Sequence, residues 1–324
     1  MRNGRVRWGV LGAAKIADEW LNPAIHLSGR GGLAAMASRD EARAAVMAAP
    51  YGARAVAGYG ALLADPEIDA IYIPLPNSDH VPWTLRCLEA GKHVLCEKPI
   101  ALEAGEIDRL IAARDRTGLV VGEAFMVVHH PQWHRVREIV SGGGIGRLRH
   151  VQGAFSFFND DPGNIRNKAD LGGGALRDIG VYPSVTTRFV TGAEPDTVSA
   201  EIDFEAGIDA TARVWARFAD FHMDFYVSMR MAPRQLMTFH GTQGWVSVHA
   251  GFNAGLYGDA EIEVRTGDAV RVLERFPCAD QYRAQIDAFN AAVLDGVPFP
   301  CSLEFSRGNQ RMIDMIYRAA GAPS

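Results

Sequence analysis

The 324-residue sequence lacks the features that mark secreted, membrane and nucleic-acid-binding proteins. Its four cysteines are scattered without a C-x-x-C spacing, which favours reduced thiols over a disulfide framework or a zinc site. No apolar run approaches the roughly 18 residues of a membrane helix. The N-terminal stretch "MRNGRVRWGVLG" has no signal-peptide pattern. These absences predict a cytoplasmic protein with no membrane partner.

Clustered positive charge is also absent. The net charge is −5, the pI is near 6.1, and no long basic run is present, which argues against nucleic acid as a partner. Metal ligands are few as well. His130 and His134 have helical i, i+4 spacing, but Pro131 lies between them and no third ligand is nearby. We therefore predict a polar packing role for these histidines and no metal site.

The first third of the chain alternates between short apolar runs and helical patterns. We expect strands at residues 6–12, 32–38, 68–76, 92–98 and 119–125. Strict alternation predicts an α/β fold with a doubly wound parallel sheet, here a Rossmann domain over residues 1–123. Ligands of such sheets bind at the carboxyl ends of the strands. Gly12, Ser38, Pro76, Lys98 and Glu123 lie at or near those ends.

Two strand ends carry signals for a dinucleotide. Gly12-x-Ala14-x-x-Ala17 follows the first strand and resembles the G-x-G-x-x-G/A fingerprint, with alanine in place of the second glycine. The second strand ends in Ser38-Arg39-Asp40. NAD enzymes place Asp or Glu there, whereas a hydroxyl and a guanidinium suit a 2′-phosphate. We predict NADP rather than NAD, unless Asp40 takes the position of Ser38.

The rest of the chain predicts an α+β domain over residues 124–302. Consecutive strand-like stretches with short turns indicate a large, mostly antiparallel open sheet. The first of these strands is separated from the second by a Gly-rich loop and a helical stretch at 174–192. The chain ends with helices near 281–295 and 303–320. We expect the last helix, about 303–324, to pack back on the first domain.

Six motifs, in this order along the full length, resemble the Gfo/Idh/MocA family of oxidoreductases. They are "WGVLGAAKIA", "PLPNSDH", "AGKHVLCEKPIAL", "GEAFMVVHHPQW", "GGGALRDIGVYP" and "CSLEFSRGNQRMIDMIYRAA". The form "GGGAL-x-D-x-G-x-Y" is similar to the dihydrodiol and xylose dehydrogenase branch, near glucose–fructose oxidoreductase. The resemblance implies an NAD(P)-dependent dehydrogenase or reductase that acts on CH–OH groups.

The resemblance also implies roles for three residues. Lys98, in the E-K-P motif, corresponds to a lysine beside the nicotinamide ribose and the substrate hydroxyl. Asp178 and Tyr182 match the second-domain motif, and their i, i+4 spacing places both on one helix face. Tyr182 is the expected general acid/base. A free phenol has a pKa near 10, and a neighbouring ammonium such as Lys98 lowers it. Asp178 is expected to orient Lys98 or the substrate.

The expected cofactor contacts come from the strand ends and from one second-domain arginine. Asn77 is expected against the ribose or pyrophosphate, although Asn77 or Ser78 could simply cap the next helix. The full set of expected cofactor residues is Gly12, Ala13, Ala14, Lys15, Ile16, Ser38, Arg39, Leu75, Pro76, Asn77, His80, Glu97, Lys98 and Arg166.

The chain departs from the family pattern at two places. Ile165 precedes Arg166 where relatives often have tryptophan, and Val127-Val128-His129-His130 replaces an aromatic residue and an arginine. These departures are expected to alter the substrate or nicotinamide face, so the sugar specificity of a relative does not apply to this chain. We predict an aldose 1-dehydrogenase or keto-sugar reductase that uses NADP and a carbohydrate-like substrate. The alternatives are an NAD-dependent glycosidase of the same fold and a non-catalytic regulator. The exposed face of the second sheet is expected to form a homodimer or higher homo-oligomer.

Overall fold

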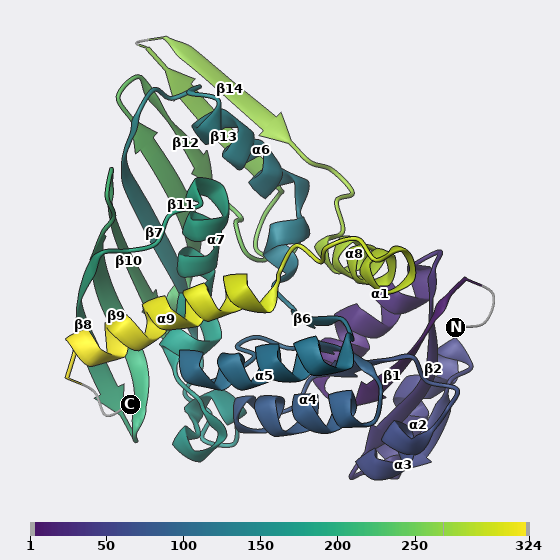
Figure 1. Cartoon of the computed structure of the whole chain (residues 1–324). Helices are drawn as coiled ribbons and strands as arrows, with labels where there is room; N and C mark the ends of the chain where they lie inside the picture. The colour runs from purple at the N-terminus through teal and green to yellow at the C-terminus, as the bar shows by residue number, and fades with distance from the viewer. Residues whose placement is uncertain (1–3, 268, 322–324) are drawn as a thin grey trace. The chain divides into compact units, whose positions relative to one another are not determined.

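The computed structural model describes residues 4–267 and 269–321, which divide into two compact units. The first unit runs to His129 and includes Asp280–Arg307. The second comprises His130–Ala279 and the chain from Gly308 onward. Each unit contains one sheet, and the order of its elements can be followed in Figure 1.

The first unit contains a parallel six-stranded sheet in the order β3-β2-β1-β4-β5-β6. Its strands are β1 (Val6–Leu11), β2 (Gly31–Ser38), β3 (Arg54–Ala57), β4 (Ala70–Ile73), β5 (His93–Cys96) and β6 (Val121–Glu123). The order reverses between β1 and β4, which are neighbours in the sheet although two strands separate them in the chain. Such a switch point is where doubly wound sheets bind ligands.

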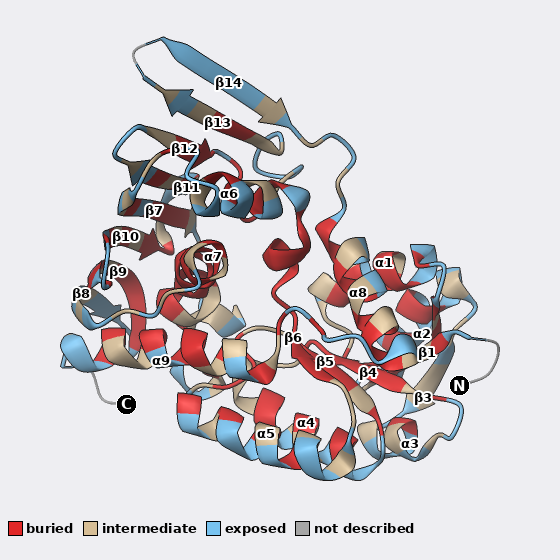
Figure 2. Ribbon diagram, turned by 45° about the horizontal axis from the view of Figure 1, so that its top comes forward, coloured by how far each residue is buried: buried red, intermediate tan, exposed pale blue. Residues whose placement is uncertain are grey.

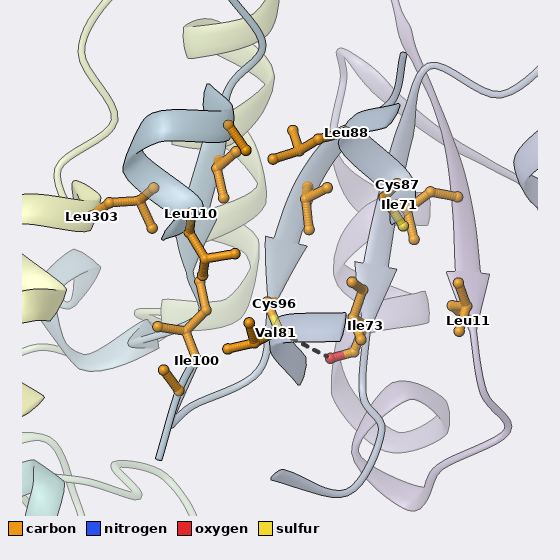
Figure 3. Packing of buried hydrophobic residues seen from close by; sticks show 14 of the residues in the cluster. Leu11, Ile71, Ile73, Val81, Cys87, Leu88, Cys96, Ile100, Leu110 and Leu303 are labelled. Atoms are coloured by element: carbon orange, nitrogen blue, oxygen red, sulfur yellow. Dashed lines mark hydrogen bonds between the residues drawn. The ribbon is translucent and has the colours of Figure 1, made fainter. Parts of the chain in front are cut away.

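Helices cover both faces of this sheet, and their bounds are α1 (Asn22–Leu27), α2 (Glu41–Ala48), α3 (Tyr59–Ala64), α4 (His80–Glu89), α5 (Ala104–Thr117) and α8 (Gln281–Asp295). On one face, Leu11, Ile71 and Leu110 belong to a cluster of buried side chains from the strands and from α3, α4 and α5 (Figure 3). On the other, the Trp8 ring packs against Phe289 of α8 with centroids 5.1 Å apart. Because apolar side chains are buried on both faces, the strands read as continuous apolar runs.

The second unit contains an eight-stranded sheet in the order β14-β13-β12-β11-β7-β10-β9-β8. Its strands are β7 (Leu148–Phe158), β8 (Thr197–Glu205), β9 (Ile208–Arg217), β10 (His222–Ser228), β11 (Arg230–Gly241), β12 (Gly244–Val248), β13 (Glu261–Thr266) and β14 (Val270–Arg275). All neighbouring pairs are antiparallel except β7 and β10. The predicted class, a Rossmann sheet plus a large mostly antiparallel sheet, is confirmed.

Three helices belong wholly or partly to the second unit: α6 (Pro131–Ser141), α7 (Val181–Thr191) and α9 (Leu303–Ala319). Helix α7 contacts α6 and β7 and is buried along almost its whole length, whereas the edge strand β14 is largely exposed (Figure 2). A helix that is enclosed on all sides is a rigid support for any functional side chain that it carries.

The structure differs from the sequence-based expectations at three places. Strand β3 was not expected, because its four residues are half exposed and lack an apolar run. Helix α8 belongs to the first unit, since Trp8 donates to Asn290 Oδ1 at 3.0 Å and their side chains are buried. Only the first turn of α9, through Leu303 and Arg307, joins the first unit, whereas the remainder contacts the second. No helix in the described ranges is long and apolar enough to cross a membrane.

Candidate active site

The carboxyl edge of the first sheet carries most of the predicted cofactor residues. Strand β1 leads into Gly12, β2 ends at Ser38, β4 leads into Leu75 and Asn77, and β5 leads into Lys98. These strands are parallel and adjacent in the sheet, so their ends meet at one edge. The arrangement is the one that the sequence predicted for a dinucleotide site.

The turn after β1 requires glycine at its first position. Gly12 has a φ of 126°, and a Cβ there would lie 3.0 Å from Leu75 Cδ2. Its N–H donates to Ala37 O at 2.8 Å, which ties the turn to β2. The following helix starts as a π-helix at Ala17–Leu21 and continues as α1. The small side chains of Ala13 and Ala14 leave room for a pyrophosphate at this turn.

The contacts at the end of β2 bear on whether Asp40 or Ser38 occupies the position that faces the cofactor ribose. Asp40 is the N-cap of α2, and its Oδ1 accepts from the Arg43 N–H at 3.0 Å. Its own N–H donates to Ser38 Oγ at 3.1 Å. Asp40 is thus engaged with the helix backbone, which leaves Ser38 and the exposed Arg39 as the residues that suit a 2′-phosphate.

The segment after β4 joins the cofactor edge to the interior. Residues Asn77–Asp79 form a 3₁₀ turn, and α4 begins at His80 with Asp79 as its N-cap. Neither Asn77 nor Ser78 therefore occupies the N-cap position. The His80 side chain is fully buried and faces two backbone carbonyl oxygens, so it presents no surface to a cofactor. A direct cofactor contact by His80 is thus unsupported, and its role is an internal one.

Lys98 follows β5 in a loop that is anchored by two buried groups. The Tyr72 hydroxyl donates to Glu97 Oε1 at 2.6 Å, and the Lys98 N–H donates to Glu97 Oε2 at 3.3 Å. The Lys98–Pro99 peptide bond is cis. Glu123, at the end of β6, accepts from the Ile100 N–H at 2.8 Å. Burial raises the pKa of Glu123 to about 7, against the opposing effect of its hydrogen bonds.

In the second unit, the structure brings two predicted site residues together. Arg166 Nε donates to Asp178 Oδ2 at 2.6 Å, and the Asp178 side chain is 13% exposed. Asp178 lies in a π-helical turn, Leu176–Gly180, which runs directly into α7 and Tyr182. The i, i+4 spacing of Asp178 and Tyr182 therefore runs through a π turn and not through a regular α turn, and a π turn has more residues than an α turn. Such π turns are frequent at functional sites.

Tyr182 stands among aromatic rings. Its ring centroid lies 5.5 Å from Phe155 of β7 and 5.4 Å from Phe252, and those two rings stack at 4.8 Å. Tyr182 is 5% exposed. Tilted and stacked contacts of this kind hold a ring in one orientation, so the position of the phenol oxygen is set by packing.

Asp209, on β9, supports the start of the helix that carries Asp178 and Tyr182. Its carboxylate accepts from the Leu176 N–H at 2.6 Å and from the Tyr317 hydroxyl at 2.7 Å. Burial raises the pKa of Asp209 to about 6, despite these hydrogen bonds. Gly174 has a φ of 125°, and a Cβ there would overlap the Asp209 carboxylate. Asp209 was not predicted from the sequence, because its only local signal is an acidic residue inside an apolar strand.

The segment that departs from the family pattern is buried. His130 is the N-cap of α6, where its Nδ1 accepts from the Gln132 N–H at 3.1 Å, and burial lowers its pKa to about 4. The ring of His134 packs edge-on against Phe189. His130 thus makes a polar contact and His134 an aromatic one, and the polar packing role of the pair stays a prediction. Among residues 4–267 and 269–321, no group of three or more His, Cys, Asp or Glu could hold a metal ion.

Two family models match the chain. One, described as an oxidoreductase family with an NAD-binding Rossmann fold, matches residues 6–125, and the other, the GFO/IDH/MocA C-terminal domain, matches residues 133–247. The chain therefore belongs to the Gfo/Idh/MocA family of oxidoreductases, as its motifs predicted.

Its relatives include enzymes of known activity. An uncharacterized oxidoreductase of Rhizobium meliloti is 43% identical over 97% of each chain. A D-xylose 1-dehydrogenase (NADP⁺) of Haloferax volcanii is 34% identical, also over 97% of each chain. The crystal structure of a 3-ketoreductase from Actinomadura kijaniata, in complex with NADP and TDP-benzene, matches with a TM-score of 0.92 and 31% identity over 97% of this chain and 98% of that one.

Proposed function

We propose that this protein is an NADP-dependent oxidoreductase that transfers hydride between nicotinamide and a carbon of a sugar or related polyol. The observation that carries the proposal is the carboxyl edge of the first sheet, where Gly12, Ser38, Asn77 and Lys98 follow adjacent parallel strands. Gly12 has no Cβ, which leaves space at the turn for a pyrophosphate. The same edge carries the Ser38 hydroxyl and the Arg39 guanidinium, so these residues fit a dinucleotide with a 2′-phosphate.

The cofactor preference is supported by chemistry at the end of β2. Asp40 caps α2 through Oδ1, and the last residue of β2 is Ser38 rather than the acidic residue that accepts from a ribose 2′-hydroxyl in NAD enzymes. The Arg39 guanidinium lies beside Tyr59. Burial raises the pKa of Tyr59, and the nearby positive charge of Arg39 partly opposes that increase. The 3-ketoreductase of Actinomadura kijaniata and the xylose dehydrogenase of Haloferax volcanii are both named with NADP. Bound NADP supplies the hydride acceptor or donor.

The chain supplies the proton chemistry. Tyr182 removes the hydroxyl proton during oxidation and returns it during reduction. The Lys98 ammonium stabilises the phenolate of Tyr182 and binds the substrate oxygen. Arg166 donates to Asp178, and this pair orients the reacting end of the substrate and the nicotinamide. The aromatic rings around Tyr182 hold its phenol and keep bulk water from that side of the ring.

The substrate class rests on the names of relatives and on the departures of this chain. One relative oxidises D-xylose, and several reduce a keto group of a dTDP-bound sugar. We propose an aldose oxidised at C1 or a keto-sugar reduced in the reverse sense. The two buried histidines that replace the usual aromatic and arginine residues distinguish this protein from relatives with that pattern.

The test is a turnover assay of purified protein with NADP or NAD and a panel of aldoses, inositols, anhydrosugars and a dTDP-linked keto-sugar. Absorbance of the reduced nicotinamide reports the reaction. A signal with one sugar class, larger with NADP, is the expected result. Release of a sugar without net cofactor change would identify the glycosidase alternative, and cofactor binding without turnover of any compound would identify the regulator.

We also propose a homodimer that forms through the exposed face of the eight-stranded sheet. Large apolar side chains are exposed on its strands, among them Phe204, Trp215 and Leu273. Phe204 and Trp215 lie on β8 and β9 at one edge of this sheet and Leu273 on β14 at the other, and exposed apolar side chains on a sheet favour an interface. Sedimentation of the protein and of its Trp215→Arg variant tests this. A dimer that the substitution weakens is expected, and a monomeric parent protein would refute it.

A further inference from the structure

One peptide unit, next to Lys98, is held from both sides by buried side chains. The carbonyl oxygen of Pro99 lies 2.7 Å from His80 Nδ1. The N–H of Ile100 donates to Glu123 Oε1 at 2.8 Å. These two backbone groups belong to the same peptide plane, the one between Pro99 and Ile100. His80 is 0% exposed and Glu123 is 3% exposed.

His80 and Glu123 lie after or at the ends of the two strands that flank β5, the strand that leads into Lys98. Strand β5, which leads into Lys98, lies between β4 and β6 in the sheet. His80 follows β4 at the start of α4, and Glu123 is the last residue of β6. The second ring nitrogen of His80, Nε2, lies 2.8 Å from the carbonyl oxygen of Leu75. The His80 ring therefore lies between the Lys98 loop and the segment that is expected to contact the cofactor. Burial lowers its pKa, and a neutral ring has one N–H, which donates to one of these two carbonyl oxygens at a time.

Burying two ionisable side chains opposes folding unless hydrogen bonds compensate for the lost hydration. Here one partner of each is a backbone group of the loop that carries Lys98, while Glu123 also lies beside the Ser306 side chain and His80 lies against the carbonyl oxygen of Leu75. A peptide plane that is hydrogen-bonded at its oxygen and at its nitrogen cannot rotate without breaking both bonds. Its orientation in turn determines the direction in which the preceding residues leave the strand. Lys98 has a long flexible side chain, so the position of its ammonium depends in part on the backbone that carries it.

We propose that His80 and Glu123 are positioning residues that act together: they grip the Pro99–Ile100 peptide plane and thereby place the Lys98 ammonium for the reaction. The inference rests on the proposed function in so far as Lys98 acts on the substrate. It assigns His80 an internal role in place of the direct cofactor contact predicted from the sequence. It also assigns a role to Glu123, for which burial alone gives no reason.

The experiment compares four variants of the full chain. Glu123→Met removes the acceptor for the Ile100 N–H, and Glu123→Gln keeps a carbonyl oxygen in its place. His80→Phe keeps a ring and removes its nitrogens. His93→Phe is the matched control, because His93 Nδ1 accepts from the Val120 N–H at 2.9 Å at the opposite end of β5. All four remove or replace a polar group in the same unit, buried at Glu123 and His80 and half-buried at His93.

Three readouts separate positioning from general loss of stability. The first is hydrogen exchange of the Ile100 amide. The second is the rate at which limiting acetic anhydride labels Lys98, measured by mass spectrometry relative to Lys15, whose side chain is 80% exposed. The third is kcat for the sugar that the panel identifies, alongside the Kd for NADP. The first two readouts need no turnover, so they test whether His80 and Glu123 hold the Pro99–Ile100 peptide plane even if the proposed reaction is wrong.

We expect Glu123→Met and His80→Phe to speed exchange at Ile100, to change the relative labelling of Lys98, and to lower kcat by roughly 10- to 100-fold with a much smaller change in the Kd for NADP. Glu123→Gln is expected to recover most of the loss. If His80→Phe does not fold, Glu123→Met breaks the other end of the same plane and decides alone. Unchanged exchange and labelling, or a loss of kcat equal to that of His93→Phe, would overturn the proposal.

Discussion

The two units hold their candidate functional residues in different ways. In the first unit these residues lie in loops after parallel strands, and buried side chains such as His80 and Glu123 bond to the loop backbone. In the second unit Tyr182 lies on an enclosed helix, and a single carboxylate, Asp209, bonds to the backbone at the start of that helix. Loops need several anchors because they lack a repeating hydrogen-bond pattern, whereas a helix satisfies its own backbone everywhere except at its ends.

The largest expected effect is on kcat, and it comes from removing one candidate catalytic side chain from each unit. Lys98→Ala and Tyr182→Phe each remove one proposed participant in proton transfer. We expect each to lower kcat by about 10²- to 10⁴-fold, with NADP still bound. Steady-state kinetics and fluorescence titration of NADPH provide the measurements. Tyr226→Phe, on β10, serves as the control for the tyrosine. Normal turnover by Tyr182→Phe would remove that residue from the mechanism.

The anchor of the second unit is tested by Gly174→Ala. The new Cβ would overlap the Asp209 carboxylate at a backbone φ of 125°. We expect the free energy of unfolding to fall by on the order of 3 kcal/mol. Urea denaturation measures it. Gly192→Ala is the matched control, since its φ is 67° but no atom lies within 4 Å of the added Cβ. Its expected loss is about 1 kcal/mol, and equal losses would show that the carboxylate is not the cause.

The anchors of the first unit predict a pH dependence. The pKa of Glu123 is raised from 4.5 to about 7 in the folded protein, so folding favours its protonated form. This contribution to stability is complete below pH 4.5 and is lost as the pH rises through 7. Its size is about 3 kcal/mol, by linkage. Asp209, with a pKa of about 6, changes stability in the same direction.

Urea titrations between pH 4.5 and pH 8 measure this dependence. Glu123→Gln is neutral at every pH, so its free energy of unfolding should vary less over that range than that of the parent protein. The comparable substitution in the second unit, Asp209→Asn, is expected to remove a smaller part of the dependence. If Glu123→Gln leaves the dependence unchanged, the buried carboxyl of the first unit is not its source.

The smallest expected effect concerns cofactor choice within the first unit. Ser38→Asp places a carboxylate where a 2′-phosphate is expected, and the like charges repel. We expect the ratio of kcat/KM for NADP to that for NAD to fall by about tenfold or more. Arg43→Ala is a suitable control, because Arg43 contributes its backbone N–H to the α2 cap and this group remains. An unchanged ratio would mean that Ser38 does not face the 2′ position.

The elements that the sequence predicted well are those with a local pattern. All eight strands of the second sheet, and the parallel strands of the first apart from β3, follow from apolar runs and alternation. The motifs also indicated the residues that line the strand ends. The π-helical turn before Tyr182 and the burial of His80 were not predictable in this way. Residue spacing gives the same i, i+4 reading for an α turn and a π turn, and a histidine in a motif gives no sign of which groups surround it.

By itself, the sequence determined the family, the two kinds of sheet and the strand ends at which the chemistry-bearing residues lie, because these depend on periodicity and on short contiguous motifs. Only the tertiary structure decided that His80 and Glu123 grip one peptide plane, that Asp209 bonds to the helix start near Gly174, and that Asp40 is taken up by α2. The first two of these join segments that lie 19 to 33 positions apart in the chain. Such contacts arise from the packing of whole elements, and no local pattern encodes them.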